Sequence, residues 1–249
     1  MKNNLNQLPV DKFQTETQTI YPGYVEMRDN ESSLKNYNLS IVKKISNFLN
    51  NKIDILEFGA GIGTLASIWK ELNNVKPECL EIDGSSRSAL EIRGFVNYSN
   101  IKEISKKYDG VYSSNVLEHI EYDLSALKDI HTILKDDGIL VIYVPAFMCL
   151  FSALDTSVGH YRRYEKNELI EKIKLANFNV FYWSYMDSLG FFASLAVRLF
   201  GYKNKSVSLG DSKSMRFYDK YIYPLSSFLD FIGLRFVFGK NILVVAKKY

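Results

Sequence analysis

The chain has 249 residues, 47% of them hydrophobic, so it is long enough to bury one substantial core with a small cap. Its 31 Lys and Arg residues nearly balance 28 Asp and Glu residues, so charge gives no reason to expect a nucleic-acid partner. The first residues lack the apolar stretch of a secretory signal, which predicts a cytoplasmic protein.

The cysteines and histidines form no metal-binding pattern. Cys79 and Cys149 are far apart in apolar runs, and the three histidines lack metal-ligand spacing, so we expect neither a disulfide nor a metal. The longest apolar stretch, residues 189–201, contains Arg198 and is shorter than the roughly 20 residues that cross a bilayer. It predicts a buried cap helix, a substrate wall or a patch resting on a membrane surface.

The first 50 residues divide into two parts. Residues 1–20 are rich in Asn, Gln and Thr and cannot offset the entropy of ordering, so we expect a mobile tail. In residues 21–50 apolar side chains fall three or four positions apart, which predicts an N-terminal helical cap. These side chains are Leu34, Tyr37, Ile41, Ile45 and Phe48.

From residue 51 to 249, β-type runs alternate with amphipathic segments, which predicts an α/β fold with a Rossmann-like, doubly wound sheet. Residues 135–138 indicate a turn, and 188–232 predict a helical cap. Residues 147–164 lack a pattern and follow the carboxyl end of a strand, so we expect a substrate insertion there. The predicted strands are 53–58, 78–82, 108–113, 138–144, 179–185 and 242–246, the last of them optionally in a hairpin with 235–238.

Three alternating glycines separate the first predicted strand from the next helix. Gly59, Gly61 and Gly63 allow a ligand to approach the backbone closely, and the helix N-terminus offers unpaired N–H groups to an anionic group. The dinucleotide fingerprint G-x-G-x-x-G is not met, because Thr64 occupies its sixth position. The loop therefore predicts a ligand and disfavours a nicotinamide or flavin enzyme. A turn that needs its glycines only for packing is the alternative.

An acid at the end of the second predicted strand can accept both hydroxyls of a ribose. Glu81 and Asp83 are both candidates, but they point to opposite faces of the strand, so only one can face the ligand. The other is expected to be a helix N-cap or a solvated charge.

Four motifs within residues 53–145 resemble, in order and spacing, those of class I S-adenosylmethionine-dependent methyltransferases. Residues 57–63 resemble the loop beneath the methionine part of the donor, and residues 108–120 resemble the motif of the fourth strand. The acid near residue 81 and the turn at 134–140 complete the set. The resemblance implies about seven mostly parallel strands with the last antiparallel, S-adenosyl-L-methionine as donor and S-adenosyl-L-homocysteine as product.

The resemblance also implies roles for single residues. It places Glu57 near the donor amine, favours Glu81 over Asp83 for the ribose, and puts residues 115–119 beside the transferable methyl. The family's adenine-binding acid has no match in residues 96–100, so an Asn or backbone groups are expected to take that role. The implied donor-binding residues are Glu57, Gly59, Ala60, Gly61, Gly63, Thr64, Glu81, Asp83, Asn115, Val116 and Leu117.

Residues 145–164 resemble a bacterial subgroup of the type 11/type 12 methyltransferases that carries a G-H-x-R-R-Y motif, here residues 159–164. This subgroup is common beside glycosyltransferases in surface-polysaccharide gene clusters. It implies a sugar or glycan-related acceptor and leaves a peripheral membrane or glycosyltransferase association open. The likeness extends weakly to Tyr37 and to residues 239–241.

Methyl transfer to a hydroxyl benefits from positioning and from a general base. Histidine titrates near the working pH, so His160 is the first candidate base, with Asp155 to orient it or to bind substrate, and His119 is the second. The predicted substrate-binding residues are Arg162, Arg163, Tyr164 and Tyr37. In the alternative hypothesis His160 and Asp155 fix the loop, and the arginines pair with Glu165 or Glu168.

The leading hypothesis is methyl transfer to a hydroxyl of a sugar or glycan-related acceptor. A small-molecule O- or N-methyltransferase of another pathway is the closest rival. From other classes, an NAD-dependent oxidoreductase and a non-catalytic donor-binding partner of a glycosyltransferase are kept as alternatives. The sequence leaves the acceptor atom and the oligomeric state open.

Overall fold

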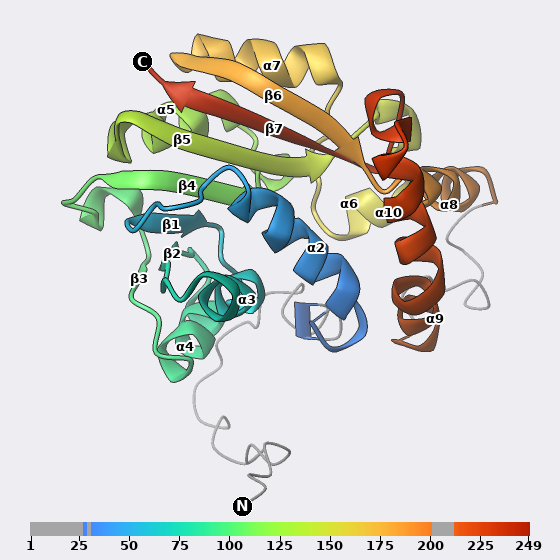
Figure 1. Cartoon of the computed structure of the whole chain (residues 1–249), viewed down its shortest axis with the longest axis horizontal. Coiled ribbons are helices and arrows are strands. Elements are labelled where there is room, and N and C mark those ends of the chain that lie inside the picture. Colours follow the sequence, from blue (N-terminus) through green and yellow to red (C-terminus); the bar gives the residue numbers. More distant parts are fainter. Residues whose placement is uncertain (1–26, 29–30, 201–211) are drawn as a thin grey trace, which may run out of the picture.

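A seven-stranded sheet forms the centre of the computed structural model, which describes residues 27–28, 31–200 and 212–249 (Figure 1). The strand order is β3-β2-β1-β4-β5-β7-β6, and β7 runs antiparallel to both of its neighbours. This confirms the predicted fold class. The predicted tail at residues 1–20 lies outside the described residues. The strands are β1 Ile55–Phe58, β2 Glu78–Leu80, β3 Asn97–Tyr98, β4 Tyr108–Ser114, β5 Leu134–Pro145, β6 Phe178–Met186 and β7 Asn241–Lys248.

Helices cover both faces of this sheet and gather at one end of it (Figure 1). None of the helices within the described ranges is long and apolar enough to span a bilayer. The α-helices are α2 Lys35–Ser46, α3 Thr64–Asn73, α4 Gly84–Ile92, α5 Asp123–Ile133, α6 Ala153–Ser157, α7 Lys166–Leu175, α8 Ser188–Phe200, α9 Ser212–Phe217 and α10 Tyr223–Phe231. Single turns are η2 Ile101–Glu103, η3 Leu117–His119, η4 Met148–Leu150, the π-helical η6 Tyr218–Ile222, and η7 Leu234–Phe236.

The central strand β5 shows how the sequence divides the core between the two faces. Alternate residues of a strand point to opposite sides, so Leu140 and Ile142 pack with the helices α5 and α7. Val141 and Tyr143 pack on the other side with α2 and with Trp69 of α3. Burial of each such side chain contributes roughly 1.5–3 kcal/mol, so the sheet holds both layers in place.

Two local predictions differ from the structure. The hairpin of residues 235–238 with the last strand is wrong, because β5 and β6 take both edges of β7, and Leu234–Phe236 forms a single helical turn. Residues 135–138 belong to an irregular first part of β5, in which Asp137 has a φ of 62° and the register to β4 shifts. The predicted separate turn is therefore a local distortion within β5.

One edge of the sheet collects the segments that carry the predicted site. The carboxyl ends of β1, β2, β4, β5 and β6 lie there, and so does the first residue of the antiparallel β7. The helix α2 and the cap formed by α8, α9 and α10 lie near this edge (Figure 1). Ligands of doubly wound sheets bind at such an edge, where the strand order reverses.

Candidate active site

The loop after β1 keeps its backbone open. Gly59, Gly61 and Gly63 have φ angles of 76°, 53° and 83°, and the last of these is the N-cap of α3. A Cβ on Gly59 would lie 2.3 Å from Val116, which belongs to the segment after β4. Only glycine tolerates both the angle and this approach. The loop thus forms a cradle at a helix N-terminus, in which the glycines alternate with the buried side chains of Ala60 and Ile62, and it fits an anionic end group such as the donor carboxylate.

The acid after β2 completes this cradle. Glu81 accepts the Gly61 N–H at 2.7 Å with one carboxylate oxygen and the Asp83 N–H at 2.9 Å with the other. Asp83 instead caps α4 by accepting the Ser86 N–H at 2.7 Å. Of the two candidates, Glu81 therefore faces the glycine loop, and Asp83 has the helix-capping role expected of the other acid.

Glu57 lies beneath the loop, one residue before the end of β1. Its carboxyl group is buried, and it accepts hydrogen bonds from the Tyr112 hydroxyl at 3.0 Å and from the backbone of Ala66 in the first turn of α3. Burial raises the pKa of Glu57 to about 8. In this position the group braces the helix N-terminus, and its contact with the donor amine stays a prediction.

The segment after β4 lies against the other side of the cradle. Asn115 has a φ of 53° and is exposed, Val116 faces Gly59, and Leu117 is buried in the core. A positive φ is tolerated by Asn better than by most residues and turns the chain sharply. Asn115 and Val116 thus lie at the cradle, whereas Leu117 can contact a ligand only through its backbone.

The insertion at residues 147–164 is attached to this same segment. The Tyr161 N–H donates to the Glu118 carbonyl at 2.8 Å. At its end the insertion returns to β5, where Tyr164 donates to Pro145 and Phe147 donates to Tyr164. These backbone bonds bring His160, 41 positions from His119 in the chain, against the residues that follow β4; the two rings meet edge to face with centroids 4.6 Å apart.

Asp155 organises the insertion. It accepts Arg163 Nε at 2.7 Å and Nη2 at 3.2 Å, and it lies 3.0 Å from His160 Nδ1. It also forms a capping box with Ser152 at the start of α6. Although burial opposes ionisation, the hydrogen bonds from His160 and Arg163 hold the pKa of Asp155 well below its usual value. The carboxylate thus fixes His160 with Nδ1 toward it and Nε2 on the far side of the ring.

Glu118 is a candidate site residue that the motif contained but to which no role was assigned. Its side chain is fully buried, and neither carboxylate oxygen has a hydrogen-bond partner among the described residues. Its Oε1 lies 4.0 Å from His160 Nε2. Burial raises the pKa of Glu118 to about 8, and the nearby Arg163 opposes this rise. The available signal was an acid next to a histidine, shortly after a predicted strand.

His119 completes a compact group with Glu118 and His160. Burial and the neighbouring His160 lower the pKa of His119 to about 4, so its ring is neutral at pH 7. One ligand atom from each of the three residues lies within 4.8 Å of the others, so they are the residues that can hold a metal ion in the described part. The positive charge of Arg163 near Glu118 opposes a cation there. The roles of His119 and His160 as bases and the absence of a metal stay predictions.

A match to a family model covers residues 31–187 and is described as a methyltransferase domain. This is more than half of the chain. The protein belongs to this family of methyltransferase domains. The predicted methyltransferase enzyme is thereby confirmed. No curated protein matches the sequence.

Solved structures of similar fold cover most of this methyltransferase. A SAM-dependent methyltransferase from Archaeoglobus fulgidus has a TM-score of 0.61 at 15% identity over 90% of this chain and 99% of its own. A 1,6-didemethyltoxoflavin-N1-methyltransferase from Burkholderia thailandensis, with bound S-adenosylhomocysteine, has a TM-score of 0.54 at 17% identity over 91% and 84%. Phosphoethanolamine N-methyltransferase 2 from Haemonchus contortus, in complex with S-adenosyl-L-methionine, scores 0.55 at 17% over 86% and 52%. At these identities the likeness supports the fold.

The remaining motif residues of this methyltransferase pair inside the protein. Arg162 Nη1 lies 2.9 Å from Asp123, which also accepts the Tyr164 hydroxyl and Lys172 Nζ at 2.8 Å each. Arg163 pairs with Asp155 and is buried. The suggested pairing of the two arginines with Glu165 or Glu168 is therefore wrong: the chain folds back so that acids from other elements lie nearer. Substrate binding by Arg162, Arg163 and Tyr164 stays a prediction.

A hydrogen-bonded pair of tyrosines spans α2 and the end of β5. The Tyr37 hydroxyl lies 2.8 Å from that of Tyr143 and accepts Asn241 Nδ2 at 2.8 Å. Asp187 follows β6 at the same edge; it is buried, accepts the Ser226 hydroxyl at 2.9 Å, and its Oδ2 has no partner among the described residues. An acid between a predicted strand and a helix was the available signal for Asp187. Tyr37 thus lies at the carboxyl end of β5, and its contact with substrate stays a prediction.

Proposed function

We propose that this methyltransferase transfers a methyl group from S-adenosyl-L-methionine to a hydroxyl of a sugar or glycan-related acceptor in the cytoplasm. The observation that carries the proposal is the hydrogen bond between Tyr161 and Glu118. It joins the segment beside the glycine cradle to the insertion that holds His160. A donor site and a group able to accept a proton therefore share one edge of the sheet.

The donor site that we propose uses the backbone of Gly59, Ala60, Gly61, Gly63 and Thr64 for the amino-acid end. Glu81 would bind the ribose in exchange for its present contact with the loop. Bound donor or product in two structures of similar fold, from Burkholderia thailandensis and Haemonchus contortus, supports this choice. When bound, S-adenosyl-L-methionine supplies a sulfonium methyl group.

The acceptor side follows from the orientation of His160. With Nδ1 held by Asp155 at 3.0 Å, Nε2 is the ring atom that can take the proton of an acceptor hydroxyl as its oxygen bonds to the methyl carbon. The bond from that carbon to sulfur breaks, and S-adenosyl-L-homocysteine leaves. Positioning along this line contributes roughly 7–11 kcal/mol to such reactions. The glycan part of the proposal, with its place in polysaccharide synthesis, is supported by the G-H-x-R-R-Y motif of the insertion.

The test is transfer of a labelled methyl group by the whole protein. Nucleotide sugars and lipid-linked saccharides would be offered as hydroxyl acceptors, with small amines as the comparison. The proposal predicts label in a base-stable methyl ether of a saccharide. Label recovered only on nitrogen, or hydride transfer with NAD and no methyl transfer, would contradict it.

A further inference from the structure

The helix formed by α9, η6 and α10 has its polar side inward. Asp219 is buried and accepts the backbone N–H groups of Asn36 and Tyr37 at the start of α2, at 3.0 and 2.8 Å. Asp230 is buried and accepts the N–H groups of Asp187 and Ser188 at 2.8 and 3.2 Å. Both acids of the helix are therefore used to cap other helices.

The outer side of the same helix is apolar. A surface helix of a globular protein normally buries its apolar stripe and exposes its polar side, so this arrangement is reversed. The outer side chains recur every three or four positions, and each is more than half exposed. They are Phe217, Tyr221, Leu225, Phe228 and Ile232, which we call the outer stripe.

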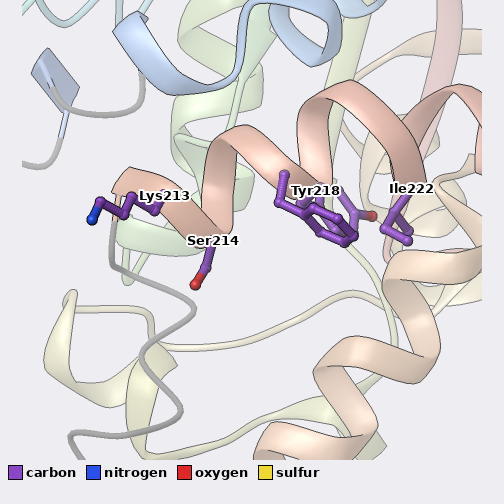
Figure 2. Close-up of a pocket in the computed structure, with 5 residues that line it drawn as sticks. Lys213, Ser214, Tyr218 and Ile222 are labelled. Carbon is purple, nitrogen blue, oxygen red and sulfur yellow. The ribbon is translucent and has the colours of Figure 1, made fainter.

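Neighbouring elements extend the outer stripe into a larger surface. Phe231 is 74% exposed at the end of α10, Phe236 and Val237 are exposed after it, and α8 adds exposed Leu199. Beside the stripe, Lys213, Ser214, Phe217, Tyr218 and Ile222 line a hollow of about 390 Å³ (Figure 2). Apolar surfaces of this extent mark a binding surface for a partner or a membrane.

Among the described residues of this surface, the exposed charges have one sign. Between residues 212 and 240 the only acids are Asp219 and Asp230, both buried, whereas Arg216 and Lys220 are exposed. A second copy of the chain docked through the same surface would set cation against cation across a two-fold axis. An anionic lipid surface attracts these charges and accepts the apolar side chains. Charge complementarity thus selects the membrane as the occupant.

We propose that the cap of α8, α9 and α10 docks on the surface of an anionic membrane, with the outer stripe inserted among the headgroups. Arg198 of α8 donates to the Cys149 carbonyl of η4, which connects this cap to the insertion that holds His160. The cap therefore contacts the insertion through α8. Resting on the proposed function, the inference names its acceptor class: a saccharide carried on a membrane lipid.

The experiment is flotation of the full chain with vesicles of phosphatidylcholine alone or mixed with phosphatidylglycerol. We expect binding to the mixed vesicles and little to the neutral ones. The variant Phe228→Ser/Phe231→Ser should lose at least about tenfold in partitioning, because two apolar side chains no longer enter the lipid. Phe181→Ser on β6, which removes a ring that is 53% exposed against 58% for Phe228, is the matched control and should bind normally.

Charge reversal by Arg216→Glu/Lys220→Glu should reduce binding to the mixed vesicles and weaken its dependence on salt. The inference would be overturned if the unmodified protein did not bind the mixed vesicles. It would also be overturned if the Phe228→Ser/Phe231→Ser variant bound them as well as the Phe181→Ser control. The inference would also be overturned if the unmodified protein formed a dimer and bound no vesicles, and the Phe228→Ser/Phe231→Ser variant were a monomer. Titration with S-adenosyl-L-methionine is read separately: failure there would remove the proposed function and leave vesicle binding unaffected.

Discussion

The glycine cradle and the insertion lie at the same edge of the sheet, but they are built differently. In the cradle, Gly59, Gly61 and Gly63 have positive φ angles, and the side chains of Ala60 and Ile62 between them are buried. In the insertion, side chains pair with one another: Asp155 holds both His160 and Arg163. The donor side is therefore specified by local backbone geometry, and the acceptor side by long-range pairing of charged groups.

We expect the largest loss of stability when the buried ion pair between Asp155 and Arg163 in the insertion is removed. Asp155→Ala leaves Arg163, which is 6% exposed, without its counter-ion, so we expect the free energy of unfolding to fall by about 3–5 kcal/mol. Urea denaturation measures this loss. The double variant Asp155→Leu/Arg163→Met removes both charges at similar volume and should lose much less. An equal loss in both variants would show that the pair does not organise the insertion.

The cradle is tested through its affinity for the donor. In Gly59→Ala the new Cβ would meet Val116 at 2.3 Å, and the φ of 76° is strained for alanine. We expect the Kd for S-adenosyl-L-methionine to rise at least about 100-fold, equivalent to about 2.7 kcal/mol. Gly233→Ala is the control, since its φ is 124° and no atom lies within 4 Å of the new Cβ. Unchanged affinity in Gly59→Ala would refute the cradle.

A substitution of His160 should change turnover in the insertion without changing donor binding in the glycine cradle. His160→Ala should lower turnover at least about tenfold while the Kd for the donor stays within about twofold, because the cradle does not include this ring. His131→Ala changes a histidine at the far end of α5 and is the control. Turnover that is unchanged in His160→Ala would assign the residue to loop structure.

The smallest expected effect concerns pH. Glu118 has a pKa of about 8 in the folded protein against 4.5 in the unfolded chain, so folding retains a proton and stability is lost as pH rises toward 8. Glu118→Gln should make this slope shallower by up to about 1.4 kcal/mol per pH unit. Denaturation at pH 6.5 to 8 avoids the opposite contribution of His119, whose pKa is about 4. Exposed Glu121→Gln should keep the original slope, and an unchanged slope in Glu118→Gln would contradict the assignment.

The sequence predicted features that depend on local residues and missed those that depend on contacts distant in the chain. The strands, the helix after β1 and the glycine loop depend on alternation and on residues next to one another in the chain, so the fold class was predictable. The partners of Arg162 and Arg163 were not, because Asp123 reaches Arg162 only after the insertion folds onto α5, and Asp155 reaches Arg163 only after the insertion turns back on itself. The antiparallel direction of β7 was predicted from the resemblance, but the optional hairpin was wrong for the same reason: the apolar residues of β7 fit a hairpin as well as a place between β5 and β6.

The sequence of α10 also did not predict that its polar side faces the protein. Its apolar residues predicted a helical cap, but their spacing does not state which side of the helix faces the protein. Buried Asp230, which caps α8, decides this orientation and leaves Phe228 outward. Contacts between elements, rather than local preference, therefore determine the surface on which we expect a membrane.

The central claim is that the cradle binds a sulfonium nucleoside, and calorimetric titration of the whole protein tests it most directly. S-adenosyl-L-methionine and S-adenosyl-L-homocysteine should each bind with one site per chain, and NAD should give no saturable heat. No binding of either sulfur compound at millimolar concentration, or saturable binding of NAD in their place, would contradict the account.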